Sequence, residues 1–189
     1  MPGIRAILLA AGSSTRFGSN KLLHKIEGVE VAVLSARNLA AALPDTLAVI
    51  RSNAQLESVL RAAGCHVVVC ENADEGMGVS LACAVRASAE ASGWIVALAD
   101  MPFIQPSTIT AIADPVTRGA AVAAPVYRGQ RGHPVCFSRS LRDELLSLKG
   151  DEGARRIFQR HGRPQNLVEV DDPGVLRDID VQEDLDSPS

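Results

Sequence analysis

Two cations in a glycine-bearing loop near the N-terminus are the residues best suited to chemistry. Arg16 and Lys21 follow the apolar run from Ile4 to Ala11, with Gly12 before them and Gly18 between them. The apolar run predicts a buried strand of a parallel sheet. Glycines let backbone amides approach a ligand closely, while a guanidinium and an ammonium neutralise phosphate oxygens. We interpret this loop as a cradle for a triphosphate; the alternative is a turn with solvated cations.

Two common phosphate-binding motifs do not fit this loop. Gly12 and Gly18 are too far apart for the Walker pattern G-x-x-x-x-G-K-[ST], and Lys21 neither adjoins Gly18 nor precedes Ser or Thr. The dinucleotide pattern G-x-G-x-x-G is excluded because Ser14 stands where its second glycine is required. What remains is L-A-A-G-x-S-x-R-x-G-x-x-K after a predicted strand.

A lone carboxylate follows another buried run. Asp100 comes directly after the apolar residues 94–99. Because Mg²⁺ prefers one or two carboxylates plus phosphate oxygens and water, we predict that Asp100 is a Mg²⁺ ligand; a helix N-cap is the alternative. Asp178 and Asp180 flank Ile179 and point to the same side of an extended chain. One of them could supply a second carboxylate, and a solvated acidic turn is the alternative.

Two further segments carry candidate binding groups. Residues 76–80, Gly-Met-Gly-Val-Ser, are predicted to form a turn whose backbone amides could bind a base or a phosphate. The alternative is an ordinary strand-to-helix turn without a ligand. In Arg131-Gly132-His133-Pro134, the histidine could bind an anionic acceptor, assist proton transfer or close the turn by a hydrogen bond. Asp151 and Arg155 could belong to the same acceptor side, with surface ion pairs as the alternative.

The elements that must position these residues alternate in the first half of the chain. Strands are predicted at residues 4–11, 46–50, 65–70 and 94–99, and helices at 29–43, 54–63 and 79–91. Without hairpin signals in this half, the alternation predicts a parallel sheet, whose carboxyl strand ends bring the candidate segments to one rim. In the second half we expect helices at 107–113 and 141–148, strands at 120–127, 131–137 and 166–170, and a short helix near 182–185.

Composition bounds the class of protein. The 189 residues suit one α/β domain, and 47% apolar with only 3% aromatic residues indicates a core of Ala, Val and Leu. A net charge of −3 gives no support for nucleic-acid binding. Cys65, Cys70, Cys83 and Cys136 show no C-x-x-C spacing, which favours buried thiols over a metal site or disulfides. Lacking a signal peptide or a membrane-length apolar run, the sequence predicts a cytoplasmic protein without a membrane partner.

The first loop resembles the signature loop of nucleotidyltransferases with a Rossmann-like, GT-A-type fold. The whole set of motifs resembles the molybdenum cofactor cytidylyltransferases, within the MobA-like molybdopterin nucleotidyltransferases. The resemblance runs in order through Leu9 to Leu23, Gly76 to Leu81, Leu98 to Pro102, Arg131 to Phe137, Gly150 to Arg155 and Asp178 to Leu185. It implies one nucleotidyltransferase domain at residues 1–186, with a mostly parallel sheet covered by helices on both faces, and a tail at 187–189.

The resemblance also implies a reaction and a set of site residues. CMP from CTP would join the phosphate of molybdenum-bearing molybdopterin, releasing pyrophosphate, and the product could pass to a molybdoenzyme or its chaperone. Arg16, Lys21 and Asp100 would be catalytic, and Asp100 and Asp180 would hold Mg²⁺. The nucleotide-binding residues would be Leu9, Ala10, Ala11, Gly12, Ser13, Ser14, Arg16, Lys21, Asn72, Gly78 and Ser80. The acceptor-binding residues would be Arg131, Gly132, His133, Pro134, Asp151 and Arg155.

The choice of base rests on one small residue. Guanylyl members of the group typically show L-A-G-G in the first loop, whereas Ala11 here precedes Gly12 and resembles the cytidylyl pattern. Leu98 stands where a proline is common in the cytidylyl group. Alternatives are a guanylyltransferase, a sugar-phosphate or isoprenoid-phosphate nucleotidyltransferase of the same fold, and a non-catalytic molybdopterin-binding chaperone.

Overall fold

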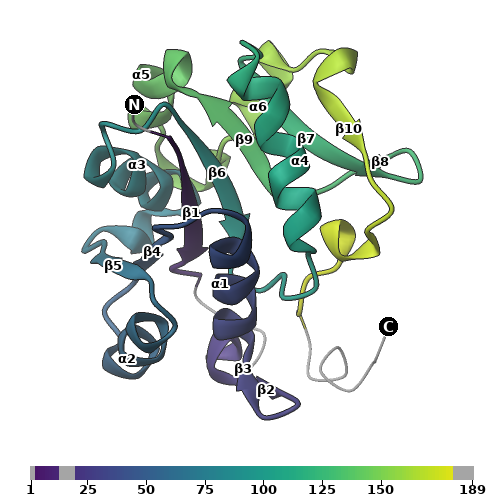
Figure 1. Ribbon diagram of the computed structural model, residues 1–189. Coiled ribbons are helices and arrows are strands. Elements are labelled where there is room, and N and C mark those ends of the chain that lie inside the picture. The colour runs from purple at the N-terminus through teal and green to yellow at the C-terminus, as the bar shows by residue number, and fades with distance from the viewer. Residues whose placement is uncertain (1–2, 13–19, 181–189) are drawn as a thin grey trace.

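The computed structural model describes residues 3–12 and 20–180, which form an α/β domain with one central sheet (Figure 1). Its strands are β1 (Ile4–Ala10), β4 (Leu47–Ile50), β5 (His66–Val69), β6 (Gly93–Leu98), β7 (Val122–Tyr127), β8 (Gln130–Arg131), β9 (Val135–Ser138) and β10 (Leu167–Glu169). Neighbouring strands follow the order β10-β7-β9-β6-β1-β4-β5, and β8 pairs with β7. The pairs β1–β4, β1–β6, β4–β5 and β7–β10 are parallel, while β9 runs antiparallel to β6 and β7. The predicted, mostly parallel sheet is confirmed.

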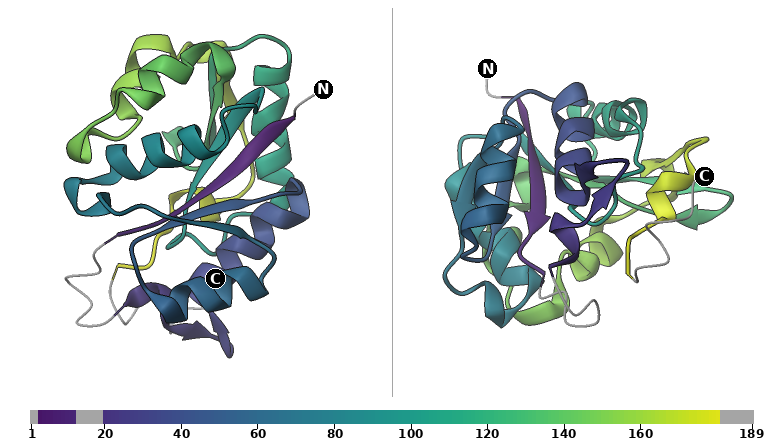
Figure 2. Two further views of the ribbon diagram at one scale, coloured as in Figure 1. Left: turned by 90° about the vertical axis from the view of Figure 1, so that its left-hand side faces the viewer. Right: turned by 90° about the horizontal axis from the view of Figure 1, so that it is seen from below.

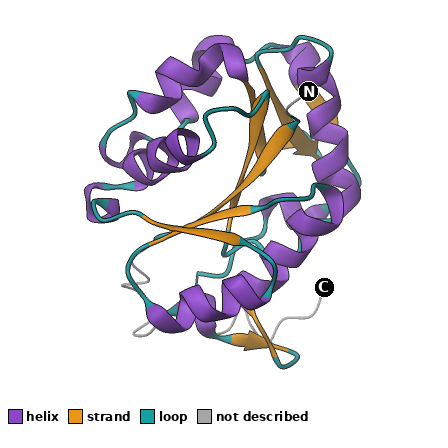
Figure 3. Cartoon of the chain, turned by 60° about the vertical axis from the view of Figure 1, so that its left-hand side comes forward, coloured by secondary structure: helices purple, strands orange, loops and turns teal. Residues whose placement is uncertain are grey.

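Helices cover both faces of this sheet (Figures 2 and 3). They are α1 (Val31–Ala42), α2 (Ala54–Ala62), α3 (Met77–Ala87), α4 (Pro106–Thr117), α5 (Arg142–Leu146) and α6 (Arg155–His161). Side chains of β1 alternate between the faces, as the pleat of a strand requires. Leu8 packs in the cluster that contains residues of α1, α2 and α4, whereas Ile7 packs in the one that contains residues of α3, α5 and α6.

Small aliphatic residues fill most of the core, but two aromatic residues, one on β6 and one on β9, are also part of it. Trp94 of β6 and Phe137 of β9 are opposite each other in the antiparallel pair, and both are fully buried. The Trp94 indole donates a hydrogen bond to the Ser88 hydroxyl at 3.0 Å, so its polar atom is satisfied. Truncating either ring should cost about 3–5 kcal/mol.

Several element boundaries differ from the sequence-based prediction. The helix predicted at 79–91 begins two residues earlier at Met77 and ends at Ala87. The helix predicted at 107–113 continues to Thr117, because Pro115 lies in its last turn and interrupts little. The strand predicted at 131–137 is divided into β8 and β9 by a turn. The final helix predicted near 182–185 and the tail at 187–189 lie outside the described residues.

A hairpin that the sequence analysis did not predict precedes α1. Strands β2 (Lys25–Ile26) and β3 (Val29–Glu30) pair antiparallel across Glu27 and Gly28. Both turn residues have positive φ, 50° and 84°, a conformation that glycine adopts readily. The dipeptide Glu-Gly is a weaker turn signal than Asn-Gly or Asp-Gly, and the helix predicted at 29–43 therefore includes Val29 and Glu30, which form β3 instead.

The cysteines are free thiols, as predicted. Cys65, Cys70 and Cys136 are buried and Cys83 is half-buried. Burial raises the pKa of Cys65 to about 11 and also raises the pKa of Cys136, so these sulfurs stay protonated. Among residues 3–12 and 20–180, no helix combines the length and the apolar character needed to cross a membrane.

Candidate functional site

Three carboxylates and one ammonium meet beyond the end of β6. Oxygens of Asp100, Asp178 and Asp180 lie within 4.8 Å of one another. Lys21 Nζ lies 2.7 Å from Asp100 Oδ2 and 3.2 Å from Asp180 Oδ1. The structure therefore brings Lys21, Asp100 and Asp180, predicted from three distant segments, into direct contact. We call these four residues the carboxylate cluster.

Local structure fixes each member of the carboxylate cluster. Lys21 opens a short 3-10 turn, η1 (Lys21–Leu23), which begins with the Asn20 side chain accepting a hydrogen bond from the Leu22 N–H at 3.1 Å. Leu22 is buried, so its neighbour Lys21 is held against the domain. The Asp100 carbonyl accepts a hydrogen bond from the Ile179 N–H at 2.8 Å, and fully buried Ile179 anchors the chain between the other two carboxylates.

The electrostatics of the carboxylate cluster favour a further cation. Burial lowers the pKa of Lys21, but its bonds to Asp100 and Asp180 outweigh burial and leave that pKa raised, so the amine is charged. Partial burial raises the pKa of Asp178, and the nearby Asp180 and Asp100 raise it further. Three carboxylates thus face one ammonium. Their hard oxygen donors fit Mg²⁺ or Mn²⁺, which bind carboxylates together with phosphate oxygens.

A cavity of about 490 Å³, which we call the nucleotide-side cavity, opens beside the end of β1. It is lined by Leu9, Ala11, Gly12, Arg51, Ala73, Asp74, Gly76, Met77, Ser80 and Asp151. Four residues predicted to bind nucleotide are therefore in its wall: Leu9, Ala11, Gly12 and Ser80. Ser13, Ser14 and Arg16 lie outside the described residues.

The other predicted nucleotide-binding residues lie elsewhere. The Ala10 side chain is buried in the core against the opposite face of the sheet. Asn72 is exposed and does not line the nucleotide-side cavity, and neither does Gly78. A Cβ on Gly78 would lie 2.9 Å from the Gly150 carbonyl oxygen, so this glycine serves close backbone packing.

The turn at Gly76 joins two segments that are far apart in the sequence. Gly76 has a φ of 123°, and a Cβ there would overlap the Gly150 carbonyl group. Next to it, the Met77 N–H donates to Asp151 Oδ1 at 3.4 Å. The start of α3 is therefore tied to the 3-10 turn η4 (Gly150–Glu152), and Asp151 is in the wall of two cavities.

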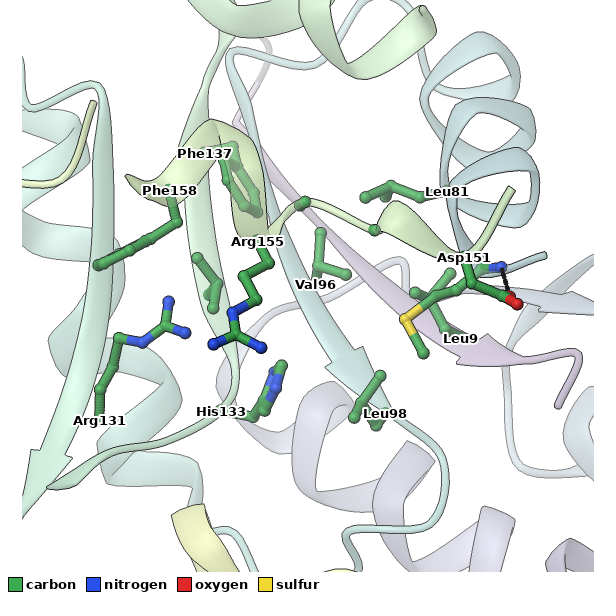
Figure 4. Close-up of a pocket in the computed structure, with 14 residues that line it drawn as sticks. Leu9, Leu81, Val96, Leu98, Arg131, His133, Phe137, Asp151, Arg155 and Phe158 are labelled. Atoms are coloured by element: carbon green, nitrogen blue, oxygen red, sulfur yellow. Dashed lines mark hydrogen bonds between the residues drawn. The ribbon is translucent and has the colours of Figure 1, made fainter. Parts of the chain in front are cut away.

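The second cavity, of about 330 Å³, lies against the β6 and β9 side of the sheet (Figure 4). Its floor is apolar and includes Leu81, Val96, Leu98, Val135 and Phe137. Figure 4 shows Arg131, His133 and Arg155 gathered at one side of this floor and Asp151 at the other. We call it the acceptor-side cavity, because four of the six predicted acceptor-binding residues line it; Gly132 and Pro134 do not.

The cations of the acceptor-side cavity are held close together. The Arg131 guanidinium lies 4.3 Å from the centre of the Phe158 ring, a cation–π contact. Loss of solvent lowers the pKa of Arg131, and the charge of Arg155 lowers it further. Burial and Arg131 lower the pKa of His133, although Asp100 opposes this. Two guanidinium groups beside a neutral imidazole make this end of the cavity suited to an anion.

The His133 ring retains an unused hydrogen-bonding atom. Its Nδ1 is buried and has no hydrogen-bond partner among the described residues. The backbone N–H of His133 donates to the Val175 carbonyl at 2.9 Å, which fixes the turn between β8 and β9. A buried polar atom without a partner costs about 1–3 kcal/mol, so a ligand that bonds to this ring would recover that cost.

Sequence reasoning missed several residues of these cavities, among them Arg51, Asp74 and Phe158. Arg51 follows β4 and pairs with Asp74 at 2.8 Å in the wall of the nucleotide-side cavity. The rule that ligands bind at carboxyl strand ends applies to Arg51 as it does to Asp100, and would have found it. Phe158 gave no such signal, because only the packing of α6 brings its ring beneath Arg131.

Known proteins resemble this chain over nearly its full length. Purine catabolism protein PucB of Bacillus subtilis is 33% identical, covering 98% of this chain and 95% of its own length. A probable molybdenum cofactor guanylyltransferase of Nostoc is 27% identical, covering 98% and 90%. The structure of Rv0371c from Mycobacterium tuberculosis in complex with manganese is 29% identical, with a TM-score of 0.75 and coverage of 96% and 95%.

A protein-family comparison covers the segment that contains both cavities. The family model of the MobA-like NTP transferase domain matches residues 6–165, which include every residue that lines either cavity, whereas Asp178 and Asp180 of the carboxylate cluster lie beyond the match. The chain belongs to the MobA-like NTP transferase family.

Proposed function

We propose that this nucleotidyltransferase joins CMP from CTP to the phosphate of molybdenum-bearing molybdopterin and releases pyrophosphate. The observation that carries the proposal is the shared wall of the two cavities, formed by Leu9, Met77 and Asp151. A nucleotide in one cavity and a phosphate-bearing acceptor in the other would be neighbours. Such proximity is the main requirement of a phosphoryl-type transfer between two bound substrates.

In this proposal an oxygen of the acceptor phosphate attacks the α-phosphorus of the nucleotide, and the bond to the β-phosphate oxygen breaks. The attacking group is already an anion, so the chain need not supply a strong general base. Lys21 and Arg16 neutralise the triphosphate, and Asp100 and Asp180 would hold Mg²⁺. When bound, Mg²⁺ neutralises charge on the nucleotide phosphates and on the leaving pyrophosphate.

The acceptor-side cavity supports a planar ring compound that carries a phosphate. Leu81, Val96 and Phe137 offer apolar surface to a ring, while Arg131 and Arg155 offer two forks to an anion. A sugar phosphate would present hydroxyl groups to this apolar floor and leave them unsatisfied. The floor therefore favours a pterin over a sugar among the acceptors of this fold.

Ala11 supports CTP as the nucleotide. It lines the nucleotide-side cavity, and its methyl group narrows the space that a glycine would leave at this position. A smaller space favours the single ring of cytosine over the double ring of guanine. GTP is the second candidate, because a relative that covers most of this chain is named as a guanylyltransferase.

Metal and pathway assignments are also part of the proposal. The manganese complex of a structural relative supports a divalent cation at the carboxylate cluster, and we propose that the cation is Mg²⁺. The relative named as a molybdenum cofactor guanylyltransferase is consistent with our proposal that the product is handed to a molybdoenzyme or its chaperone. We propose that the reaction takes place in the cytoplasm.

The test is pyrophosphate release by the purified protein with Mg²⁺ and molybdenum-loaded molybdopterin, comparing CTP, GTP and ATP. We expect CTP to be used best and no release without the pterin. Faster release with GTP would replace the cytidylyl assignment by the guanylyl one. Tight pterin binding without release from any nucleotide would identify a non-catalytic carrier instead.

A further inference from the structure

A buried carboxylate lies outside the carboxylate cluster and outside the walls of both cavities. Asp172 is only 2% exposed. Its Oδ2 accepts hydrogen bonds from the Gln105 N–H at 2.8 Å and from the Thr108 hydroxyl at 2.7 Å. Its Oδ1 accepts one from the Gly174 N–H at 3.0 Å. Asp172 thus ties the start of α4 to the segment 172–180, which we call the strap.

The strap next fixes the turn that carries His133. It contains the 3-10 turn η6 (Pro173–Leu176), in which the Val175 carbonyl accepts the His133 N–H at 2.9 Å. A Cβ on Gly132 would overlap the same carbonyl, so the turn and the strap are in direct backbone contact. A shift of the strap would therefore move a side chain of the acceptor-side cavity.

The strap ends in the carboxylate cluster. The Ile179 N–H donates to the Asp100 carbonyl at 2.8 Å, with Asp178 and Asp180 on either side. Two further contacts hold the middle of the strap against the loop after β6. Gly174 has no room for a Cβ beside the Phe103 carbonyl, and the Arg177 guanidinium lies 4.0 Å from the centre of the Phe103 ring.

Figure 1 shows the strap, in yellow after β10, running beside the end of α4 that contains Pro106. Asp172 is its first fixed point, the contact with the His133 turn is its second, and the contact with Asp100 is its last. None of the described residues that line the nucleotide-side cavity belongs to the strap. The strap thus links the acceptor-side cavity to the carboxylate cluster without lining the nucleotide-side cavity.

We propose that Asp172 is a positioning residue that acts through the strap on both metal binding and acceptor binding. The reason is its set of three donors, which no shorter or neutral side chain can satisfy in the same way. Asparagine keeps one acceptor oxygen, but its NH₂ group would face the N–H or O–H donors that bond to the second carboxylate oxygen of Asp172. Asp172→Asn should therefore loosen the strap at its start. The acceptor part rests on the proposed function, whereas the metal part rests only on the carboxylate cluster.

The experiment compares full-length Asp172→Asn with the unmodified chain by Mn²⁺ titration followed by electron paramagnetic resonance, without nucleotide or pterin. We expect the Kd for Mn²⁺ to rise severalfold, which is less than the effect of losing a direct hydrogen-bond partner of a metal ligand, because Asp172 acts on the carboxylate cluster only through the strap. In the pyrophosphate assay at saturating Mg²⁺, the KM for the pterin should rise severalfold while the KM for CTP changes less than about twofold, since the metal site is then filled and the strap does not line the nucleotide-side cavity.

One control variant separates positioning from a general loss of stability, and a second variant replaces Asp172→Asn if that protein does not fold. Ile112→Val removes a methylene from a fully buried position of α4 and should cost about 0.5–1.5 kcal/mol without touching the strap. It should lower the Tm but leave the Mn²⁺ Kd and the pterin KM unchanged. If Asp172→Asn does not fold, Thr108→Val removes one of the three donors and should change both values in the same direction by a smaller factor.

The inference would be overturned if Asp172→Asn left the Kd for Mn²⁺ and the KM for the pterin unchanged. It would also be overturned if Ile112→Val changed both quantities as much as Asp172→Asn does. A parent chain that binds no Mn²⁺ would overturn both this inference and the metal assignment. Failure of the proposed function would look different, because the parent would then bind Mn²⁺ and release no pyrophosphate. The metal titration would still decide whether Asp172 positions the carboxylate cluster.

Discussion

The two cavities are built in different ways. The nucleotide-side cavity is lined mainly by residues at or after the ends of β1, β4 and β5, which are parallel neighbours in the sheet, and Asp151 of η4 completes its wall. The acceptor-side cavity combines β6 and β9 with a turn, α6 and the segment before it. The nucleotide-side cavity follows largely from the general rule for parallel sheets, whereas the acceptor-side cavity depends mainly on how distant segments pack. In the proposed function, the parallel strands would hold the nucleotide and the packing of distant segments would select the acceptor.

The largest effect should come from the carboxylate cluster, whose residues line neither cavity. Asp100→Asn removes a charge that pairs with Lys21 at 2.7 Å and faces Asp178 and Asp180. We expect kcat for pyrophosphate release to fall by about a thousandfold, because charge stabilisation at the α-phosphate is lost. Circular dichroism should show an unchanged fold. Near-normal turnover would remove Asp100 from the mechanism.

Removal of one guanidinium should affect the acceptor side alone. Arg155→Ala should raise the pterin KM by about 10–100-fold, the equivalent of a lost charged hydrogen bond, and leave the CTP KM within about twofold. Initial rates over a matrix of both substrate concentrations measure the two values. Arg118→Ala, which breaks an exposed pair with Asp114, is the matched control and should change neither. An equal rise in both KM values would mean that the cavities are not separate.

A substitution at Gly76, where the start of α3 meets η4, should affect both cavities through the backbone. Gly76→Ala places a Cβ into the Gly150 backbone at a φ of 123° and should destabilise the fold by about 1–3 kcal/mol. Both KM values should rise, because η4 moves away from α3. Gly64→Ala also has a positive φ, 87°, but nothing lies within 4 Å of its Cβ. Chemical denaturation should show a smaller loss for Gly64→Ala, near 1 kcal/mol; equal losses would contradict the close packing at Gly76.

The smallest effect concerns pH. The folded pKa of His133 lies below its ordinary value of 6.5, mainly through burial. As the pH falls below 6.5, the unfolded chain therefore takes up a proton that the folded chain does not, and stability decreases by at most about 1.4 kcal/mol per pH unit. His133→Gln should remove this part of the acid sensitivity. Urea denaturation at pH 7.5 and 5.5 measures it, and an identical pH dependence in both proteins would contradict a neutral His133.

The difference between the two cavities also explains which features could be predicted from the sequence. In the parallel half, hydrophobic runs and helical spacing located β1, β4, β5 and β6, and the rim rule brought Lys21 and Asp100 together. In the second half, the strand predicted at 131–137 is interrupted at residues 132–134, where Gly132 packs against Val175, 43 residues further along the chain. Asp172 had no motif at all, since its role arises from donors on α4 that only the folded chain brings to it.

The most direct test of the account is a crystal structure with Mn²⁺ and a non-hydrolysable CTP analogue. We expect an anomalous peak between Asp100 and Asp180, and the cytosine in the nucleotide-side cavity beside Ala11 and Arg51. The acceptor-side cavity with Arg131 and Arg155 should stay free of the nucleotide. A cytosine bound over Phe137 in the acceptor-side cavity, or a metal peak away from the carboxylate cluster, would contradict the account.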